Sequence, residues 1–531
     1  MYIIGKRLVL LLFGFSVFGQ SKDLGIDQIR EKFECPAWFK DAGFGIWLHW
    51  GAQTEPEIGG GWYARHMYMQ DVGKETWGQK AYDYHVNKYG HPSEFGYKDV
   101  INQWKAEHLD PDYLVKYFKR IGAKYFMVLA NHHDHFDNFD SSYHEWNSVN
   151  VGPKKDIVGL FREAARKNEI PFGVSSHDDR FLGWWQTAFG SDINGPMKGK
   201  PYDGYMTKND GNGKWWEGLD PANLYGLPPE KRTPEYVEAV KENWVERHKE
   251  LAIKYDVDML WFDGYGYPYG TYGEEVVRAF YNNMLKKHGE FSGLAAGKVS
   301  NDPIMIRDIE RGGANEILNE PWQGIITFGS WFYKNDTPVR HNARTILEML
   351  ADMNSKNGNL MLNVELYSDG TIPEVQKGEL DEIGNWMSVN AEAIYGTEAW
   401  EIFGDNLNSI YKIKDGENIG EVDLKALEEN KNKGHFNERT VDSPLYGSEE
   451  VRFTKKGNHL YVFVLNPKSG EISLPSLGTK SEFKVNKISN ISMLGSAKKI
   501  KFQQGPDKLT FSIPKNRPTP YVTVFKIKGA L

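Results

Sequence analysis

A chain of 531 residues is long enough for two domains, because a single hydrophobic core seldom grows beyond about 250–300 residues. Its net charge of −8 is spread over interspersed acidic and basic residues, so we expect no nucleic-acid partner and no binding to an anionic membrane surface. Aromatic residues make up 14% of the chain, with 17 Trp and 28 Tyr, which suits either an aromatic core or a site for the apolar faces of sugars.

The amino-terminal segment has the layout of a secretory signal peptide. Lys6 and Arg7 precede an apolar stretch of about a dozen residues, and small or polar residues follow at 19–21. The apolar stretch is too short to span a bilayer, and no later stretch reaches 18 consecutive apolar residues. We therefore expect residues 1–19 to be a signal peptide and the mature protein to be exported, to the periplasm or the extracellular space, without a membrane span.

Cys35 is the only cysteine of the chain. One thiol cannot form an intramolecular disulfide, and it cannot supply a zinc site or an iron–sulfur cluster built from cysteines. Cys35 also does not follow the apolar stretch directly, which argues against a lipid-anchored amino terminus.

Between residues 36 and 395, short apolar runs alternate with helical patterns. Six runs are predicted as strands: 44–51, 124–133, 171–177, 258–264, 297–302 and 358–366. Five segments with apolar residues at i, i+3 and i+4 are predicted as helices: 110–123, 154–168, 233–255, 273–289 and 342–358. In the first helix, Asp110 is predicted as the N-cap and Pro111 as the first helical residue. Repeated β–α units of this kind indicate an α/β fold with a parallel sheet, and their number favours a (β/α)₈-type barrel as the catalytic domain, over 36–395.

From residue 396 onward, the pattern changes to that of antiparallel β structure. The runs 459–465 and 521–527 alternate with a period of two, and turn-forming residues stand at 455–458, 466–470 and 504–507. The polar stretch 414–440 is predicted to be a loop. Residues 396–531 are therefore expected to form a C-terminal antiparallel β-sandwich domain.

Polar side chains cluster at the carboxyl ends of the predicted strands, where barrels and open parallel sheets both build their active sites. These residues are His49, His132, His133, His177, Asp263 and Asp302. No glycine-rich phosphate-binding loop follows the first strand, so the sequence does not support a nucleotide cofactor, and we expect no cofactor.

The stretch "NHHDHFDNFDS", residues 131–141, carries three histidines and three aspartates directly after a predicted strand. A catalytic metal site is one interpretation, but no HExxH motif and no HxH pattern with a distant partner is evident. A second is purely structural, with one histidine in the core and the others in solvent. We favour a third, ligand binding without a metal, because neutral imidazoles can both donate to and accept from hydroxyl groups.

Asp263 ends the predicted strand 258–264, and the next predicted helix begins too far away for Asp263 to cap it. If the site hydrolyses glycosides, a second carboxyl group is required across the scissile bond. The acidic residues that follow are Glu274, Glu275, Glu310, Glu316 and Glu320. The first two open a helix, where acidic side chains simply suit the helix dipole. We favour Glu310, which we expect in an irregular segment after the next strand.

Six segments in the same order resemble glycoside hydrolase family 29, the retaining α-L-fucosidases. They are "FGIWLHWG", "HHDHFDNFDS", "GPKKDIVGLFREAARK", "LWFDG", "PWQGIITFGSWFY" and "GNLMLNVELYSDGTIP". The resemblance covers residues 36–400, and the downstream sandwich fits it. It implies a barrel enzyme that removes terminal α-L-fucose from glycans or polysaccharides through a covalent intermediate, with a carbohydrate as its partner and without metal or cofactor.

The resemblance also implies roles for individual residues. Asp263 matches the family's nucleophile, and Glu310 would be the general acid and then the general base. The residues that match the family's hydroxyl-binding histidines are His49, His132 and His133, and those at its aromatic wall are Trp62, Trp261 and Trp331.

The chain departs from the family's pattern at three places. Many members have Gly where this chain has His135, many have Glu where Gly61 stands, and many have Arg where Pro303 stands, with Arg307 as a candidate substitute. These departures keep two alternatives open. One is an exo-glycosidase for another α-L-sugar, such as α-L-galactose in an algal-type or sulfated polysaccharide. The other is a carbohydrate-binding protein without activity on a degenerate barrel.

Overall fold

The computed structural model describes residues 23–71, 77–299, 301–335, 339, 341–407, 410–413 and 441–531. The predicted signal peptide, 1–19, and the predicted loop, 414–440, lie outside the described residues. Within the described part of the chain, no helix combines the length and the apolar composition needed to cross a bilayer.

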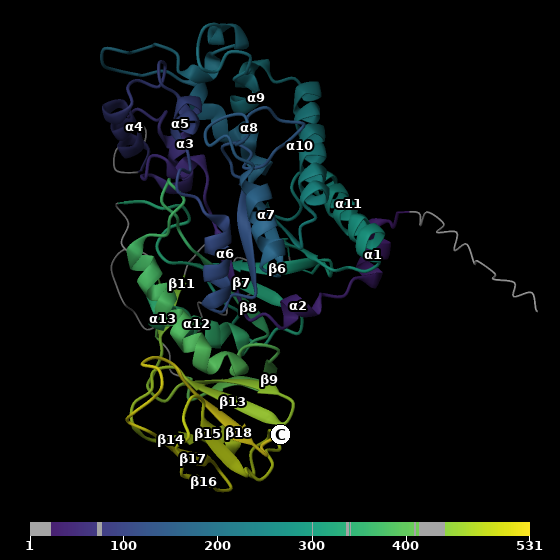
Figure 1. The fold of residues 1–531 in the computed structure, drawn as a ribbon, viewed down its shortest axis with the longest axis vertical. Coiled ribbons are helices and arrows are strands. Elements are labelled where there is room, and N and C mark those ends of the chain that lie inside the picture. The colour runs from purple at the N-terminus through teal and green to yellow at the C-terminus, as the bar shows by residue number, and fades with distance from the viewer. Residues whose placement is uncertain are drawn as a thin grey trace, which may run out of the picture.

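Eight parallel strands form a closed barrel, which confirms the predicted (β/α)₈-type architecture (Figure 1). The strands follow one another around the barrel in chain order, and the last pairs with the first. They are β1 (Phe44–Leu48), β2 (Tyr125–Asn131), β3 (Phe172–Ser176), β4 (Met259–Tyr265), β5 (Leu294–Lys298), β6 (Met305–Glu310), β7 (Trp322–Thr327) and β8 (Gly358–Asn363).

Helices surround the barrel and extend its loops. The longer ones are α4 (Trp77–Lys88), α6 (Pro111–Arg120), α7 (Ile157–Lys167), α10 (Pro234–Tyr255), α11 (Thr271–His288), α12 (Ala343–Asn354) and α13 (Glu374–Asn390). The shorter ones are α1 (Ile26–Lys32), α2 (Ala37–Lys40), α3 (Tyr63–His66), α5 (Tyr97–Gln103), α8 (Phe181–Trp184) and α9 (Ala222–Tyr225). Asp110 caps α6 as predicted, because its side chain accepts a hydrogen bond from the backbone N–H of Tyr113 at 2.9 Å.

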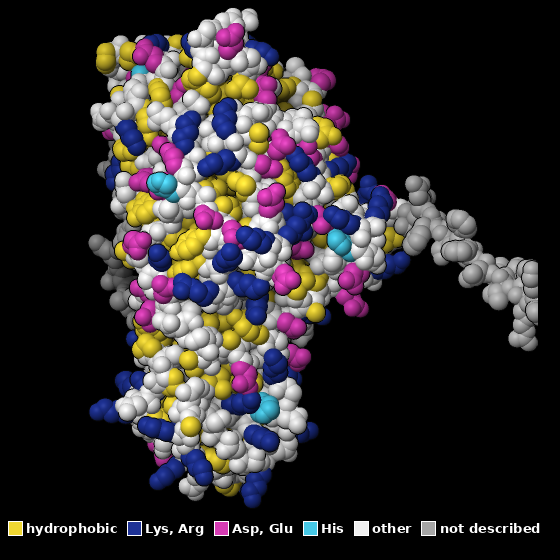
Figure 2. Space-filling model, in the orientation of Figure 1, with side chains coloured by type: hydrophobic (Ala, Val, Ile, Leu, Met, Phe, Trp, Pro, Cys, Tyr) yellow, Lys and Arg dark blue, Asp and Glu magenta, His cyan; other side chains and the backbone are white. Residues whose placement is uncertain are grey.

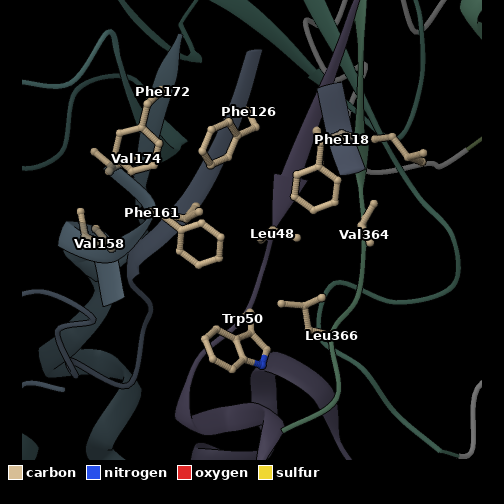
Figure 3. Close-up of a cluster of buried hydrophobic side chains, with 14 of the residues drawn as sticks. Leu48, Trp50, Phe118, Phe126, Val158, Phe161, Phe172, Val174, Val364 and Leu366 are labelled. Atoms are coloured by element: carbon tan, nitrogen blue, oxygen red, sulfur yellow. The ribbon is translucent and has the colours of Figure 1, made fainter. Parts of the chain in front are cut away.

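Alternate residues of each strand point into the barrel and out toward the helices. Outward-facing Phe126 of β2 lies between Phe118 of α6 and Phe161 of α7, with ring centroids 6.4 and 6.1 Å away (Figure 3). Inward-facing Trp47 and Trp261 meet inside the barrel with centroids 4.6 Å apart. The barrel is therefore filled with side chains, and only its ends are left to bind a ligand.

The strands β5, β6 and β7 differ from the sequence-based expectation. The strand β5 lies at 294–298 rather than 297–302, and β6 and β7 have no counterpart among the six predicted strands. Among the residues described, no helix separates β5 from β6 or β6 from β7. The alternation of strands and helices, which predicted the barrel, is therefore absent from the described residues of this part of the chain.

The C-terminal domain consists of antiparallel sheets, as predicted. A five-stranded sheet has the order β15 (Asn490–Met493), β18 (Thr523–Lys528), β13 (His459–Val464), β12 (Val451–Lys456) and β9 (Glu398–Asp405). A three-stranded sheet has the order β14 (Gly470–Leu474), β17 (Leu509–Ile513) and β16 (Phe502–Gln504), and β10 (Ile410–Ile413) pairs with β11 (Val441–Leu445). Phe511 and Phe525 join the two larger sheets in one core, with ring centroids 4.8 Å apart.

The C-terminal domain packs against α12 and α13 at the amino end of the barrel (Figure 1). Arg452 of β12 pairs with Asp352 of α12, with 2.5 Å between Nε and Oδ1. The backbone N–H of Ala399 donates to Asn357, which precedes β8. The predicted domain boundary, between residues 395 and 396, falls in the connection from α13 to β9. The described residues of this domain thus lie away from the carboxyl end of the barrel. Figure 2 shows charges of both signs mixed over the face of the molecule that Figure 1 presents.

Candidate functional site

The carboxyl ends of six consecutive barrel strands bring a set of ionisable side chains together. They are His49 after β1, His132 and His133 after β2, His177 after β3, Asp263 in β4, Lys298 ending β5 and Glu310 ending β6. Parallel barrel strands end on one face, where the following loops can shape a site. The residues predicted as candidate catalytic and binding groups meet at this face.

Asp263 lies at the centre of the cluster and is 7% exposed. Its Oδ1 is 2.8 Å from Nζ of Lys298, and its Oδ2 is 3.6 Å from Nδ1 of His177 and 3.7 Å from Nε2 of His133. Burial alone would raise the pKa of the Asp263 carboxyl, but the contact with His177 and the charge of Lys298 outweigh it and hold the pKa well below its usual range. Asp263 is therefore ionised and suited to act as a nucleophile.

Glu310 binds the same ammonium group as Asp263. Oε2 of Glu310 lies 2.5 Å from Nζ of Lys298, so one nitrogen bridges the two carboxylates. Burial opposes the charge of Lys298, but Asp263 and Glu310 raise its pKa above the usual value. Glu310 is the last residue of β6 and not part of an irregular segment, which corrects our expectation. A barrel strand therefore fixes its position.

The histidines around Asp263 are neutral near pH 7. Burial holds the pKa values of His49 and His132 well below the usual range and lowers that of His133 to about 4. Nδ1 of His132 is 2.9 Å from Nε2 of Gln53, and Nδ1 of His133 is 2.5 Å from the backbone oxygen of His177. These partners orient the rings, so that the imidazoles can exchange hydrogen bonds with hydroxyl groups.

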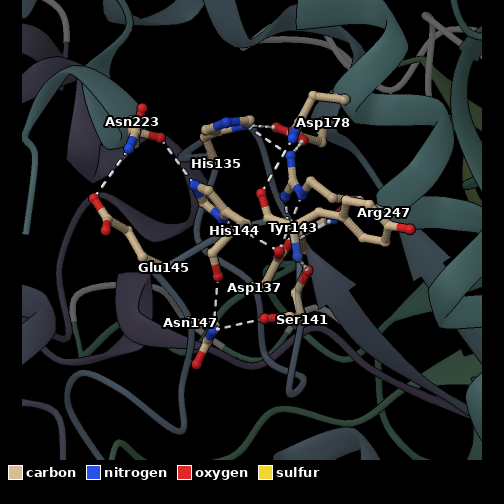
Figure 4. A network of polar contacts seen from close by, with 12 residues as sticks. His135, Asp137, Ser141, Tyr143, His144, Glu145, Asn147, Asp178, Asn223 and Arg247 are labelled. Atoms are coloured by element: carbon tan, nitrogen blue, oxygen red, sulfur yellow. Dashed lines mark hydrogen bonds and ion pairs between the residues drawn. The ribbon is translucent and has the colours of Figure 1, made fainter.

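The third histidine of the 131–141 stretch turns away from Asp263. Nδ1 of His135 lies 2.7 Å from Asp178, which also accepts a hydrogen bond from Arg247 at 2.8 Å (Figure 4). Arg247 lies 2.5 Å from Asp137, and Asp137 is 3.2 Å from Nδ1 of His144. This network fastens the loops after β2 and β3 to α10. His135 therefore supports the site without lining it.

Aromatic rings line the cluster on two sides. The rings of Trp331 and His49 lie 4.7 Å apart, and those of Trp261 and His177 lie 4.9 Å apart. Trp62 is 41% exposed and lies 6.1 Å from the ring of His133. The three predicted tryptophans are thus placed where a flat apolar ligand face could stack.

The departure at Gly61 and the predicted strand-end residue Asp302 each have a structural explanation. A Cβ atom built at Gly61 would lie 2.9 Å from the Phe332 ring and 3.1 Å from the His132 ring, so the position cannot hold a side chain without moving one of them. Asp302 accepts hydrogen bonds from Arg30 at 3.0 Å and from Tyr267 at 2.8 Å. Asp302 therefore ties the amino-terminal helix α1 to the barrel, which is a structural role.

A third carboxyl group lies beside the nucleophile candidate. Burial and the charge of Asp263 raise the pKa of Asp179 to about 7, and among the described residues its Oδ1 has no hydrogen-bond partner. A Cβ atom at Gly264, whose φ is +91°, would come within 2.9 Å of Oδ2 of Asp179. Only glycine lets Asp179 approach the end of β4 so closely. Below neutral pH, Asp179 is a protonated neighbour of the pocket.

No sequence pattern marked Lys298, Asp179 or Arg180 as a site residue, and His177 was predicted only as a strand-end residue. Nη2 of Arg180 lies 4.0 Å from Oδ2 of Asp263. The rule that found Asp263 also placed His177 at a strand end, but gave it no role in binding or catalysis. Lys298 was hidden because the fifth strand was predicted three residues too late, which put Lys298 inside it.

Comparison with protein families gives two matches. A family described as α-L-fucosidase matches residues 25–392, and one described as the α-L-fucosidase C-terminal domain matches residues 447–528. The tissue α-L-fucosidase of Homo sapiens is 25% identical over 513 residues, which cover 91% of this chain and 86% of that protein. The tissue α-L-fucosidase of Bos taurus is 26% identical over 407 residues, which cover 72% and 73%.

Solved structures share the fold. The Thermotoga maritima α-fucosidase in complex with fucose aligns with a TM-score of 0.65 at 24% identity, covering 94% of this chain and 98% of that chain. The α-L-fucosidase isoenzyme 1 from Paenibacillus thiaminolyticus aligns with a TM-score of 0.61 at 20% identity, covering 95% and 99%. Both alignments span the barrel and the C-terminal domain.

Proposed function

The chain belongs to the α-L-fucosidase family of glycoside hydrolases, and we propose that it removes terminal α-L-fucose from glycans or polysaccharides as an exo-acting, retaining enzyme. The family match over residues 25–392 confirms the resemblance stated from the six sequence segments. We also propose that residues 1–19 direct export of the protein.

One observation carries the proposal: Asp263 and Glu310 share the ammonium group of Lys298. Each carboxylate oxygen lies within 2.8 Å of Nζ, so these two oxygens are no farther apart than the roughly 5–5.5 Å typical of retaining glycosidases. Inverting enzymes need roughly 6.5–9.5 Å, because a water molecule must fit between the sugar and the base. The short separation supports a covalent, double-displacement mechanism.

In the first step, the carboxylate of Asp263 attacks C1 of the fucosyl residue. The bond from C1 to the aglycone oxygen breaks, and that oxygen takes a proton from Glu310. For Glu310 to carry this proton, Lys298 must stay with Asp263 and release Glu310 as the aglycone enters. The second step is hydrolysis of the fucosyl ester, in which Glu310 takes a proton from the attacking water and the anomeric configuration is retained.

The neutral histidines and the tryptophans bind the sugar. The imidazoles of His49, His132 and His133 can donate to and accept from the sugar hydroxyls, while Trp261 and Trp331 offer apolar faces. Hydrogen bonds that shorten as the oxocarbenium-like transition state forms contribute to kcat.

Release of nitrophenol from the aryl α-L-fucoside and from the aryl α-L-galactoside tests the proposal. We expect kcat/KM to be higher for the fucoside. Faster release from the galactoside would favour the alternative glycone, which the missing side chain at Gly61 keeps open. Tight binding of L-fucose without release from either glycoside would contradict the proposal and favour a non-catalytic binding protein.

Glu310→Gln is expected to lower kcat/KM by about 10²–10⁴-fold for a fucoside with a poor leaving group, and by far less for a nitrophenyl fucoside. An aglycone that leaves without a proton does not need the general acid. Leaving-group dependence is therefore the measurement, and Asp179→Asn is the matched comparison because Asp179 also lies beside Asp263. If the strong leaving-group dependence appears in Asp179→Asn and not in Glu310→Gln, the acid is Asp179.

Lys298→Met is expected to move the acid limb of the kcat/KM–pH profile to higher pH. Lys298 helps to hold the pKa of Asp263 low, so its loss raises that pKa and the nucleophile is protonated at a higher pH than in the wild type. We also expect kcat to fall by about 10²-fold, because the two carboxylates lose their common anchor. Lys298→Arg keeps the charge and should keep the acid limb in place. An unshifted limb in Lys298→Met would contradict this role.

A further inference from the structure

Three buried histidines in the pocket form a group that could hold a metal ion. Ligand-capable nitrogens of His132, His133 and His177 all lie within 4.8 Å of one another. The side chains come from the ends of two neighbouring strands, β2 and β3, which fix their positions. The carboxylate of Asp263 stands beside two of the three rings.

The hydrogen bonds of His133 leave a lone pair directed at Asp263. A backbone carbonyl can only accept, so Nδ1 of His133, 2.5 Å from the oxygen of His177, carries the hydrogen atom. Its Nε2 is then an acceptor, and it lies 3.7 Å from Oδ2 of Asp263, which is also an acceptor. Two acceptors that face each other at this distance favour a cation or a donor between them.

A nitrogen of His177 faces the same oxygen, Oδ2 of Asp263, as Nε2 of His133 does. Its Nδ1 lies 3.6 Å from Oδ2 of Asp263, and its buried Nε2 has no hydrogen-bond partner within the described part of the chain. Lys298 binds the other carboxylate oxygen, Oδ1, so Oδ2 remains available to an ion. Arg180 approaches Oδ2 to 4.0 Å, but its side chain is 45% exposed and can turn toward solvent.

The donor set suits a late first-row transition metal. Bonds of about 2.0–2.1 Å in a tetrahedral site place ligand atoms about 3.4 Å apart, close to the observed 3.6 and 3.7 Å. Imidazole nitrogens with one carboxylate oxygen are typical zinc ligands. The carbonyl of His177 accepts the hydrogen atom on Nδ1 of His133, as outer partners do in metal sites. Nε2 of Gln53 donates to Nδ1 of His132, so this amide must turn its oxygen toward Nδ1 when Nε2 of His132 binds the ion.

We propose that His132, His133, His177 and Asp263 bind one divalent late first-row metal ion, such as Zn²⁺, and that this ion and the sugar exclude each other. The ion would cover the carboxylate that attacks C1, so its occupancy inhibits hydrolysis. The exclusion rests on the proposed function, whereas binding of the ion does not.

Calorimetric titration of the full, tag-free chain with ZnCl₂ tests the site, and visible absorption after CoCl₂ addition reports its geometry. We expect one ion per chain and the intense bands of tetrahedral Co²⁺. His177→Gln should weaken Zn²⁺ binding at least about tenfold. His108→Gln is the matched control, because His108 is 71% exposed and pairs with Asp369 on the surface. Saturating L-fucose should lower the apparent Zn²⁺ affinity of the wild type.

The other outcomes distinguish the metal site, its exclusion of the sugar and the proposed hydrolysis. No Zn²⁺ or Co²⁺ binding at millimolar concentration, or binding that is unchanged in His177→Gln, overturns the site. Binding that is lost in His177→Gln but indifferent to L-fucose, in a chain that hydrolyses the fucoside, overturns the exclusion. Metal binding at these histidines in a chain that hydrolyses no fucoside contradicts the proposed function and leaves the site intact. If His177→Gln does not fold by circular dichroism, His132→Gln takes its place.

Discussion

Asp263→Gly is expected to hydrolyse aryl α-L-fucosides at least about 10⁴-fold more slowly than the wild type, because it lacks the group that attacks C1. Its fold should be preserved, since Lys298 keeps its ion pair with Glu310 when Asp263 is removed. The loss should therefore lie in kcat, while the melting temperature changes little.

Sodium azide provides the control for this variant. A small anion can enter the space left by the carboxylate and attack C1 from the same face, so azide should restore part of the activity and yield the β-L-fucosyl azide. Asp263→Asn fills that space and should not be rescued. If Asp263→Gly keeps wild-type activity, or if azide rescues another carboxylate variant in its place, the nucleophile is a different residue.

Arg247→Leu is expected to lower the free energy of unfolding by about 3–5 kcal/mol at pH 7, because it leaves two buried carboxylates without a cation. Arg247 is fully buried and pairs with Asp137 at 2.5 Å and with Asp178 at 2.8 Å. Chemical denaturation followed by circular dichroism measures the change. Arg120→Leu is the control, since Arg120 pairs with Asp381 on the surface, where such a pair contributes about 0–1 kcal/mol.

The destabilisation by Arg247→Leu should shrink as the pH falls. Burial alone would raise the pKa of Asp137, but Arg247 and His144 lower it below the unfolded value, so the wild-type pair stabilises the fold at neutral pH and loses this contribution in acid. Without Arg247, burial raises the pKa of the carboxyl, and protonation at low pH removes the unpaired charge. A difference between variant and wild type that grows as the pH falls would contradict this account of the network.

The residues that end apolar strands could be identified from the sequence. Buried parallel strands are continuous apolar runs, so the polar residue that ends each run marks the face of the barrel where a site forms. The residues found in this way are His49, His132, His133, His177 and Asp263. Their positions in the site follow from their places at the ends of buried strands, and their roles remain predictions.

Glu310 and its strand were harder to recognise because β6 breaks the apolar pattern. Three of its six residues, Arg307, Asp308 and Glu310, are ionisable. Asp308 faces the barrel interior at 2% exposure, where burial raises its pKa to about 8 and leaves it uncharged near pH 7. An ionisable residue can therefore occupy a core position when it is uncharged. A search for apolar runs does not identify such a position.

The spacing of the histidines in the stretch 131–141 does not show which of them line the pocket and which support it. His132 and His133 face Asp263, whereas His135 joins a network centred on Arg247, which is 112 residues farther along the chain. Partners this distant decide which way each side chain turns. The sequence indicated a ligand-binding loop, but only the tertiary structure separates its pocket residues from its supporting residues.

Mass spectrometry after incubation with 2-deoxy-2-fluoro-α-L-fucosyl fluoride can identify the nucleophile itself. The fluorine at C2 slows both steps, and the fluoride leaves readily, so a retaining enzyme accumulates its covalent intermediate. We predict one fluorofucosyl group per chain, attached to the peptide that contains Asp263. A label on another residue, or hydrolysis of fucosides by a chain that never becomes labelled, would contradict a retaining mechanism with Asp263 as the nucleophile.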